Sequence, residues 1–163
     1  MPVSRRYWDS DVIVSWLLNE AERVEKSQGV AAEAKADRLV LVVSALTLTE
    51  VLLYRPEKHI GRENIGIVES FFRQPFIEVV QLTSQIAEEA REFVWDYNIA
   101  AKDSIHVATA IHRGVPRMDS FDEKLISRAK PLAKSHGLTV DYPDVPYAPT
   151  LEEELSRQER EGA

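Results

Sequence analysis

The sequence contains no cysteine among its 163 residues, which excludes disulfide bonds, thiolate metal sites and a cysteine nucleophile. Long hydrophobic runs are also missing, because no apolar stretch approaches the ~20 residues that a membrane span requires. The two arginines in MPVSRRYWDS are not followed by the apolar segment of a signal peptide. We therefore expect a cytoplasmic protein that does not associate with a membrane.

An excess of positive charge, the usual signature of nucleic-acid binding, is absent as well. The formal net charge is −7, from 20 basic and 27 acidic residues. Residues 151–163 carry a net charge of −3, and the 150 residues before them carry −4. If carboxylates in this longer part bind divalent cations, its effective charge approaches zero. The acidic composition therefore does not exclude a nucleic-acid substrate.

Hydrophobic patterning predicts strands that alternate with helices. The run LVLVVSAL at 39–46 is continuous and rich in β-branched residues, which is typical of a strand buried on both faces of a parallel sheet. FIEVVQL at 76–82 has the same character, whereas residues 84–97 have helical spacing. Further strands are predicted at 5–9, 116–121 and 138–142, and further helices at 12–18, 21–36, 47–54, 62–73, 101–112 and 122–136. This alternation predicts a three-layer α/β fold in which helices flank a central, mainly parallel β-sheet.

The chain changes character after Tyr142, where three prolines occur within seven residues. This composition is typical of an extended linker. The final segment, LEEELSRQEREGA, predicts a frayed helix or a disordered tail. We expect one domain at residues 1–142, followed by a proline-rich linker and an acidic tail at 143–163.

Four acids lie near ends of predicted strands or beginnings of predicted helices: Asp9, Glu50, Asp103 and Asp122. Because the carboxyl ends of parallel strands meet at one edge of a sheet, we expect these acids to approach one another. Two carboxylates about 4 Å apart repel by about 4 kcal/mol at an effective dielectric constant of 20, so a cluster needs neutralising cations or protons. Ligation by oxygen alone suits Mg²⁺ or Mn²⁺, and such a site can transfer phosphoryl groups.

Each acid also has a structural explanation. Asp9 or Asp11 can cap the helix that begins at residue 12. The sequences TLTE at 47–50 and SFDE at 120–123 match capping boxes, in which Asp122 would be an acid of the first helical turn. Asp103 is likewise expected in the first turn of its helix. Taken singly, each acid is explained by capping or by the helix dipole, but four acids in apolar surroundings favour a shared site.

The segments YWDSDVIVSWL, SALTLTEVL, AAKDSIHVATAI and DSFDEKLI occur in the order and spacing of PIN-domain nucleases. The chain resembles the VapC-type toxin ribonucleases of toxin–antitoxin pairs over about residues 5–142, and KDSIHVATAI is the most diagnostic segment. The resemblance implies that the acids of the family fall on Asp9, Glu50, Asp103 and Asp122. It further implies an endoribonuclease with one or two Mg²⁺ or Mn²⁺ ions and products with 3′-hydroxyl and 5′-phosphate ends. A homodimer and a cognate antitoxin protein are the implied partners.

Several neighbouring residues are candidates for auxiliary roles: Ser10, Asp11, His106, Asp119 and Ser120. Asp11 stands where the family often has asparagine, so we expect it to fix the turn and cap the helix. His106 lies three residues after Asp103 on the same helix face, and a packing role is favoured over a catalytic one. Asp119 is an additional acid that strand alternation can turn away from the site. The serines either position water or phosphate, or satisfy a turn.

Basic residues near the expected site are candidate RNA contacts or ordinary solvated residues: Lys102, Arg113, Arg117, Lys124 and Arg128. The three tryptophans, Trp8, Trp16 and Trp95, stand in apolar patterns that predict core positions. Two other functions remain open. One is a non-catalytic PIN-like RNA-binding or regulatory module. The other is a metal-dependent phosphatase with Asp9 as nucleophile, although this would leave KDSIHVATAI unexplained.

Overall fold

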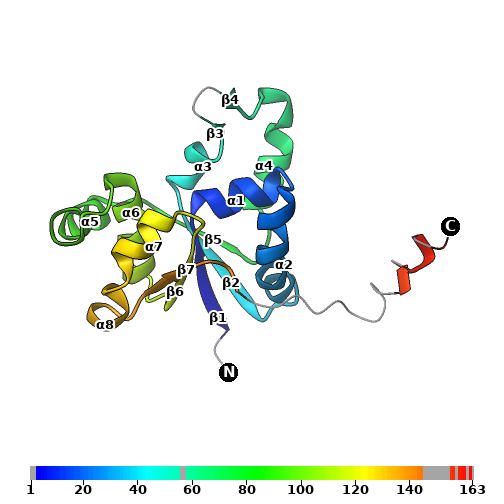
Figure 1. Cartoon of the computed structure of the whole chain (residues 1–163). Helices are drawn as coiled ribbons and strands as arrows, with labels where there is room; N and C mark the ends of the chain where they lie inside the picture. The colour runs from blue at the N-terminus through cyan, green and yellow to red at the C-terminus, as the bar shows by residue number, and fades with distance from the viewer. Residues whose placement is uncertain (1–2, 56–57, 145–154, 157, 161, 163) are drawn as a thin grey trace.

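Five parallel strands form the centre of the molecule (Figure 1). The computed structural model describes residues 3–55, 58–144, 155–156, 158–160 and 162. The strand order is β5-β2-β1-β6-β7, and each neighbouring pair is parallel. These strands are β1 (Ser4–Trp8), β2 (Leu39–Ser44), β5 (Ile77–Val80), β6 (Arg117–Asp119) and β7 (Thr139–Asp141). The predicted α/β fold with a parallel central sheet is confirmed.

Helices cover both faces of this sheet. On one face lie α5 (Ser84–Tyr97), α6 (Ala101–His112), α7 (Glu123–Ala129) and α8 (Leu132–Ser135), and on the other α1 (Ser10–Leu17), α2 (Ala21–Lys35) and α4 (Ile65–Phe72) (Figure 1). Successive residues of β1 serve the two cores: Tyr7 packs with the α5–α8 side and Trp8 with the α1, α2 and α4 side. Both side chains are 0% exposed. A strand buried on both faces explains the continuous apolar runs of the sequence.

Residues 47–54 do not form the single predicted helix. Only α3 (Thr47–Glu50) is helical, and the chain then forms an antiparallel hairpin of β3 (Leu53–Arg55) and β4 (Lys58–His59), followed by the 3₁₀ helix η1 (Arg62–Asn64). The preceding strand also ends earlier than predicted, because Ser44 Oγ accepts a hydrogen bond from the N–H of Leu46 at 3.1 Å and turns the chain. The hairpin pairing supplies backbone hydrogen bonds that a longer helix would otherwise have made.

The predicted helix at 122–136 is also wrong, because it is divided into α7 and α8. Pro131 stands between them as the N-cap residue of α8. Proline has no N–H to donate and restricts the residue before it, so one helix ends and the next begins here. The predicted helix end near Gly114 agrees with the structure, where Gly114 follows α6 with a positive φ of 65°.

One prediction about exposure needs correction. Helix α2 has a charged outer side, and Val24, Val30 and Ala34 on its inner side are buried. Trp95 was expected in the core, yet it is 76% exposed. It lies on the side of α5 opposite Ala90, since five helical residues span about 500°. Trp8 is fully buried, as predicted.

Residues beyond β7 begin by folding back against the sheet. Arg117 Nη2 donates to the carbonyl oxygen of Tyr142 at 2.6 Å, and Asp144 forms ion pairs with Arg6 and Arg117. Most of the predicted linker, residues 145–154, lies outside the described residues, whereas residues 155–156 and 158–160 are helical. None of the helices in the described ranges has the length and apolar character needed to cross a membrane.

Candidate active site

Asp9 lies at the carboxyl end of β1, where the chain passes from strand to helix. Its N–H donates to the carbonyl oxygen of Asp119 at 3.0 Å, and its own carboxylate caps α1 by accepting from the N–H of Ser10 at 2.8 Å. The Ser120 hydroxyl donates to the other carboxylate oxygen at 2.8 Å. Burial raises the pKa of Asp9, although His106 and these two donors act in the opposite direction. The sequence-predicted acid is therefore a buried carboxylate held by two donors.

Glu50 reaches the same place from the end of α3. The capping box considered for this helix is not formed: Leu46 occupies the N-cap position without a side-chain bond, and buried Thr47 Oγ1 has no hydrogen-bond partner among the described residues. The carboxylate of Glu50 instead accepts from Ser10 Oγ at 2.8 Å and lies 2.5 Å from His106 Nε2. Glu50 thus points toward Asp9 and does not stabilise its own helix.

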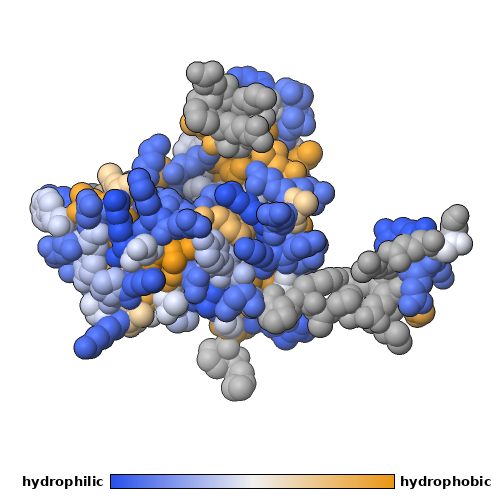
Figure 2. Space-filling view, viewed as in Figure 1, coloured by the Kyte–Doolittle hydropathy of each residue, from blue (hydrophilic) through white to orange (hydrophobic). Residues whose placement is uncertain are grey.

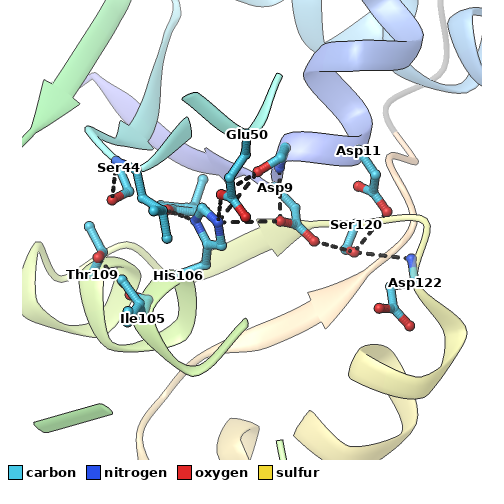
Figure 3. Close-up of polar contacts among 12 residues, drawn as sticks. Asp9, Asp11, Ser44, Glu50, Ile105, His106, Thr109, Ser120 and Asp122 are labelled. Atoms are coloured by element: carbon cyan, nitrogen blue, oxygen red, sulfur yellow. Dashed lines mark hydrogen bonds and ion pairs between the residues drawn. The ribbon is translucent and has the colours of Figure 1, made fainter. Parts of the chain in front are cut away.

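His106 lies beside Asp9 and Glu50 (Figure 3). Its Nε2 is 3.9 Å from Asp9 Oδ1, and its Nδ1 is 2.6 Å from the hydroxyl of Tyr7. Burial lowers the pKa of His106, but the hydrogen bond to Glu50 and the charge of Asp9 more than reverse this, so the pKa is raised. For Glu50 the effects are opposite in sign: burial raises its pKa, but the hydrogen bond and charge of His106 more than reverse this, so the pKa of Glu50 is lowered. Both shifts favour an ion pair.

Asp103 enters the cluster from the first turn of α6. The pKa of Asp103 is raised to about 6, mainly by burial and then by the negative charges of Asp9 and Asp122. A helix N-terminus normally favours an acid, so this rise shows that burial and carboxylate repulsion outweigh the helix dipole. Asp103 therefore shares one electrostatic field with the other three acids.

Asp122 lies across the site from Glu50 and is the N-cap of α7, not an acid of its first turn (Figure 3). Its Oδ1 accepts from the N–H groups of Lys124 at 3.0 Å and Leu125 at 3.2 Å. The hydroxyl oxygen of Ser120 accepts from the N–H of Asp122 at 3.1 Å while the same hydroxyl donates to Asp9. Ser120 therefore connects Asp9 to the start of α7.

Asp11 does not cap the helix that contains it, contrary to expectation. Its Oδ2 accepts from the N–H of Phe121 at 3.0 Å and so ties α1 to the turn between β6 and α7. Its Oδ1 is buried without a hydrogen-bond partner among the described residues. Burial, followed by the charge of Asp9, raises the pKa of Asp11 to about 8. Its surroundings therefore favour the protonated form of this carboxyl group.

Asp119 faces a different set of partners from the other acids. It accepts from Trp8 Nε1 at 3.0 Å, and its carboxylate pairs with Arg6 at 3.4 Å and with Arg117 at 3.3 Å. Burial raises its pKa to about 6 in spite of these two cations. Strand alternation turns this side chain away from the carboxylate cluster, and it also engages Arg117, one of the candidate RNA contacts.

The other candidate RNA contacts divide into two groups. Lys102 is exposed at the start of α6 and its charge lowers the pKa of Glu50, and Lys124 is exposed in the first turn of α7 beside Asp122. Arg113 instead pairs with Glu78 at the opposite end of α6, ~15 Å along the helix from Asp103. Arg128 is in the last turn of α7. Only the two lysines therefore flank the acids.

Two residues of the site were missed in the sequence. Tyr7 was read only as part of a strand, although a buried tyrosine hydroxyl needs a partner. Arg23 of α2 lowers the pKa of Asp11, and its guanidinium lies 4.9 Å from the ring centroid of Phe121. No local pattern in α2 pointed to the acids, because only the folded chain brings Arg23 beside Phe121 in the turn between β6 and α7.

The donors suit a hard divalent cation. All four predicted acids offer oxygen ligands, and a cation would relieve the repulsion that raises the pKa of Asp103. Among the residues that the structure describes, however, no three histidine or acidic side chains surround a common point as metal ligands. The oxygen chemistry of the four acids fits such an ion.

A sequence profile of the PIN domain matches residues 6–131, which is most of the chain and includes all four acids. The chain belongs to the PIN domain family. Among solved structures, this PIN domain is similar to a chain of VapBC2 from Rickettsia felis, a complex described as bound to a DNA fragment from its promoter. The TM-score is 0.58 at 14% identity, with 86% of this chain and 99% of that chain covered. No match was found among curated proteins.

Proposed function

We propose that this PIN domain protein is a metal-dependent endoribonuclease and the toxin of a type II toxin–antitoxin pair. The observation that carries the proposal is the convergence of acids around buried Asp9, where carboxylate charges contribute to raising the pKa of Asp103 to about 6. Such repulsion costs stability unless the site serves a positively charged ligand. Family membership supports hydrolysis of nucleic acid as the reaction.

The four acids would hold Mg²⁺ or Mn²⁺: Asp9, Glu50, Asp103 and Asp122. When bound, the ion supplies a water of lowered pKa and stabilises negative charge on the phosphate that this water attacks. Asp9 is prepared for this role because Ser10 N–H and Ser120 Oγ fix its two carboxylate oxygens. Lys102 and Lys124 would contact backbone phosphates on either side of the cleavage position, where positive charge positions the strand.

An exposed groove lined by both apolar and polar residues supports the proposed protein partner. It has a volume of about 480 Å³ and is lined by residues of α1, β4, η1 and α4, among them Leu17, Leu18, Ile60 and Val68. Ile67 at its edge is 61% exposed. Figure 2 shows hydrophobic residues, in orange, at the surface near α4. Apolar surface of this kind marks protein interaction sites, so we assign it to the antitoxin or to a second copy of the chain.

The test is RNA cleavage by the purified full chain with and without Mg²⁺ or Mn²⁺. A pool of structured RNAs is incubated with the wild type, Asp9→Asn and Asp103→Asn, and product ends are identified by phosphatase and ligase sensitivity. Asp96→Asn, an exposed acid on α5, is the matched control. We expect metal-dependent cleavage that only the control variant retains. Cleavage that survives both site substitutions, or that no metal supports, would contradict the proposed mechanism.

The alternative is a PIN domain that binds RNA without cleaving it. One observation favours this function: no three acidic or histidine side chains in the described ranges already surround a common point. Fluorescence anisotropy with labelled single-stranded RNA separates the two functions. Metal-independent binding without cleavage, unchanged in Asp9→Asn, would support the non-catalytic module.

A further inference from the structure

Tyr7 is a core residue whose hydroxyl contacts His106, the histidine beside Asp9 and Glu50. Its side chain is 0% exposed, and its ring lies edge-on to the imidazole of His106, with 5.8 Å between the ring centroids. The phenol oxygen is 2.6 Å from His106 Nδ1. A buried tyrosine hydroxyl needs a hydrogen-bond partner, and here that partner is a residue in contact with the acids.

The second ring nitrogen of His106 faces the opposite way. Nε2 lies 2.5 Å from Glu50 Oε1 and 3.4 Å from Ser10 Oγ. The His106 side chain is 1% exposed, so both of its nitrogen atoms are paired inside the protein. A turn of the imidazole would break both contacts at once. The orientation of Glu50 therefore depends on the orientation of His106, which in turn depends on its contact with Tyr7.

A phenol hydroxyl is well suited to hold an imidazole in this way. It donates to Nδ1 when that nitrogen is unprotonated and accepts from Nδ1–H when the ring is charged. The contact thus persists in both states of His106 and keeps Nε2 directed at Glu50. Phenylalanine at position 7 would fill nearly the same volume but could make neither bond.

We infer that Tyr7 is a positioning residue, which holds His106 so that the Glu50 carboxylate is presented beside Asp9 for binding a divalent cation. This inference rests on the proposed metal-dependent function. Carboxylate and histidine side chains at metal sites are oriented by further hydrogen bonds, and loss of such a partner lowers metal affinity by roughly 10–100-fold. Tyr7 would act through His106, because the described residues show a hydrogen bond from its hydroxyl to that side chain and none to a carboxylate.

The experiment measures Mn²⁺ affinity of the full chain by electron paramagnetic resonance, without RNA. The variants are Tyr7→Phe, His106→Ala and the double variant, with Tyr97→Phe as the matched control. Tyr97 also has a hydroxyl contact, to Ser135 Oγ at 3.2 Å, but lies away from the acids. We expect Tyr7→Phe to weaken Mn²⁺ binding about 10-fold, within the range for lost supporting hydrogen bonds. The same substitution should have no further effect when His106 is already alanine.

NMR of the wild-type protein tests the contact between Tyr7 and His106 directly, so its result does not depend on whether the variants fold. Nitrogen NMR of the His106 ring should show Nδ1 hydrogen-bonded, and a slowly exchanging proton should give a nuclear Overhauser effect between the Tyr7 ring and the imidazole. In Tyr7→Phe the Nδ1 resonance should shift, while the other three histidines keep their wild-type signals.

Three results would overturn the inference. The first is wild-type Mn²⁺ affinity in Tyr7→Phe, and the second is an absence of Mn²⁺ binding by the wild type. The third is a loss of Mn²⁺ affinity on Tyr7→Phe that is as large in the His106→Ala protein as in the wild type. Its failure can be distinguished from that of the nuclease proposal. Mn²⁺ binding with full coupling between Tyr7 and His106, but no cleavage of any RNA, would reject the nuclease and retain the positioning role.

Discussion

Asp9 and Asp119 are buried carboxylates at the ends of neighbouring parallel strands, and a backbone hydrogen bond of 3.0 Å joins the two residues. Burial raises the pKa of each. Their partners differ, because Asp119 meets two arginines and the Trp8 N–H, whereas Asp9 meets the Ser10 N–H, the Ser120 hydroxyl, a histidine and further acids. Asp119 is therefore an acid with a structural role, whereas Asp9 is suited to binding a cation.

The difference shows that burial of a carboxylate does not by itself identify a site. Both acids interrupt an apolar environment, and both have pKa values above the ordinary range. Asp119 has permanent cations within 3.4 Å, which hold it in one place. Around Asp9 the permanent cations are replaced by His106, whose charge depends on protonation, so an external cation can supply the missing positive charge.

The largest expected effect is on catalysis in Asp9→Ala. Loss of a metal ligand removes several kcal/mol of transition-state stabilisation, so cleavage should fall on the order of 10³-fold. Stability should change by about 1 kcal/mol or less, because the lost helix cap is opposed by removal of a buried charge. Single-turnover RNA cleavage and urea unfolding measure the two effects. If Asp9→Ala is strongly destabilised but its folded fraction cleaves RNA at the wild-type rate, Asp9 has a structural role like that of Asp119.

Asp119→Ala should show the opposite pattern. It leaves the Trp8 N–H and two partly buried arginines without their shared acceptor, so we expect the free energy of unfolding to fall by about 3 kcal/mol. The single-turnover rate of the folded fraction should stay within about twofold of wild type. Urea denaturation followed by tryptophan fluorescence gives the first quantity. A catalytic loss as large as that of Asp9→Ala would place Asp119 in the active site.

Asp11→Asn should change how stability depends on pH. The carboxyl group has an unfolded pKa of 3.8 and a folded pKa of about 8, so between these values the folded state binds more protons. Stability from this group therefore falls as pH rises from about 4 to 8, and asparagine, which does not ionise, removes that contribution. Each pH unit in this window corresponds to about 1.4 kcal/mol, so we expect the variant to gain about 3 kcal/mol relative to wild type at pH 8 compared with pH 5.

Urea midpoints of both proteins at the two pH values measure this gain. Asp96→Asn, an exposed acid without this burial, is the control and should give parallel pH curves. Parallel curves for Asp11→Asn as well would show that Asp11 is ionised at little cost in the folded protein.

The smallest effect is expected from Asp144→Ala at the outer end of the Asp119 network. Its side chain is 57% exposed, and its ion pairs with Arg6 and Arg117 are screened by solvent. Exposed ion pairs contribute about 0–1 kcal/mol, so we expect a change in unfolding free energy below about 0.5 kcal/mol. A loss near that of Asp119→Ala would mean that the outer acid, and not the buried one, stabilises the arginines.

Sequence reasoning succeeded where one local pattern dominated. The continuous run of β2 and the helical spacing of α5 each specify one kind of element, because their hydrophobic periods differ. It failed at residues 47–54, where hairpin pairing replaced helix, and at 122–136, where Pro131 divides two helices. Trp95 was misplaced because an apolar residue type was given more weight than its position on the helix.

Only part of the candidate site could be predicted from the sequence. The positions of Asp9 and Asp103 at a strand end and a helix start predicted that they would approach one another, since parallel strands share a carboxyl edge. The partners of Asp11 and Asp119 could not be predicted, because Phe121 and Arg6 are more than 100 residues away in the chain. The roles assigned to the four acids stay predictions until metal binding and cleavage are measured.

By itself, the sequence determined the alternation of strands and helices, the parallel sheet and the positions of the acids along the chain. These follow from short-range periodicity and from the geometry of parallel strands. Only the tertiary structure decided which acid meets which partner: His106 beside Glu50, Tyr7 behind His106, and two arginines around Asp119. The physical reason is that the charge state of a buried carboxylate depends on burial and on groups from distant segments, which only folding brings together.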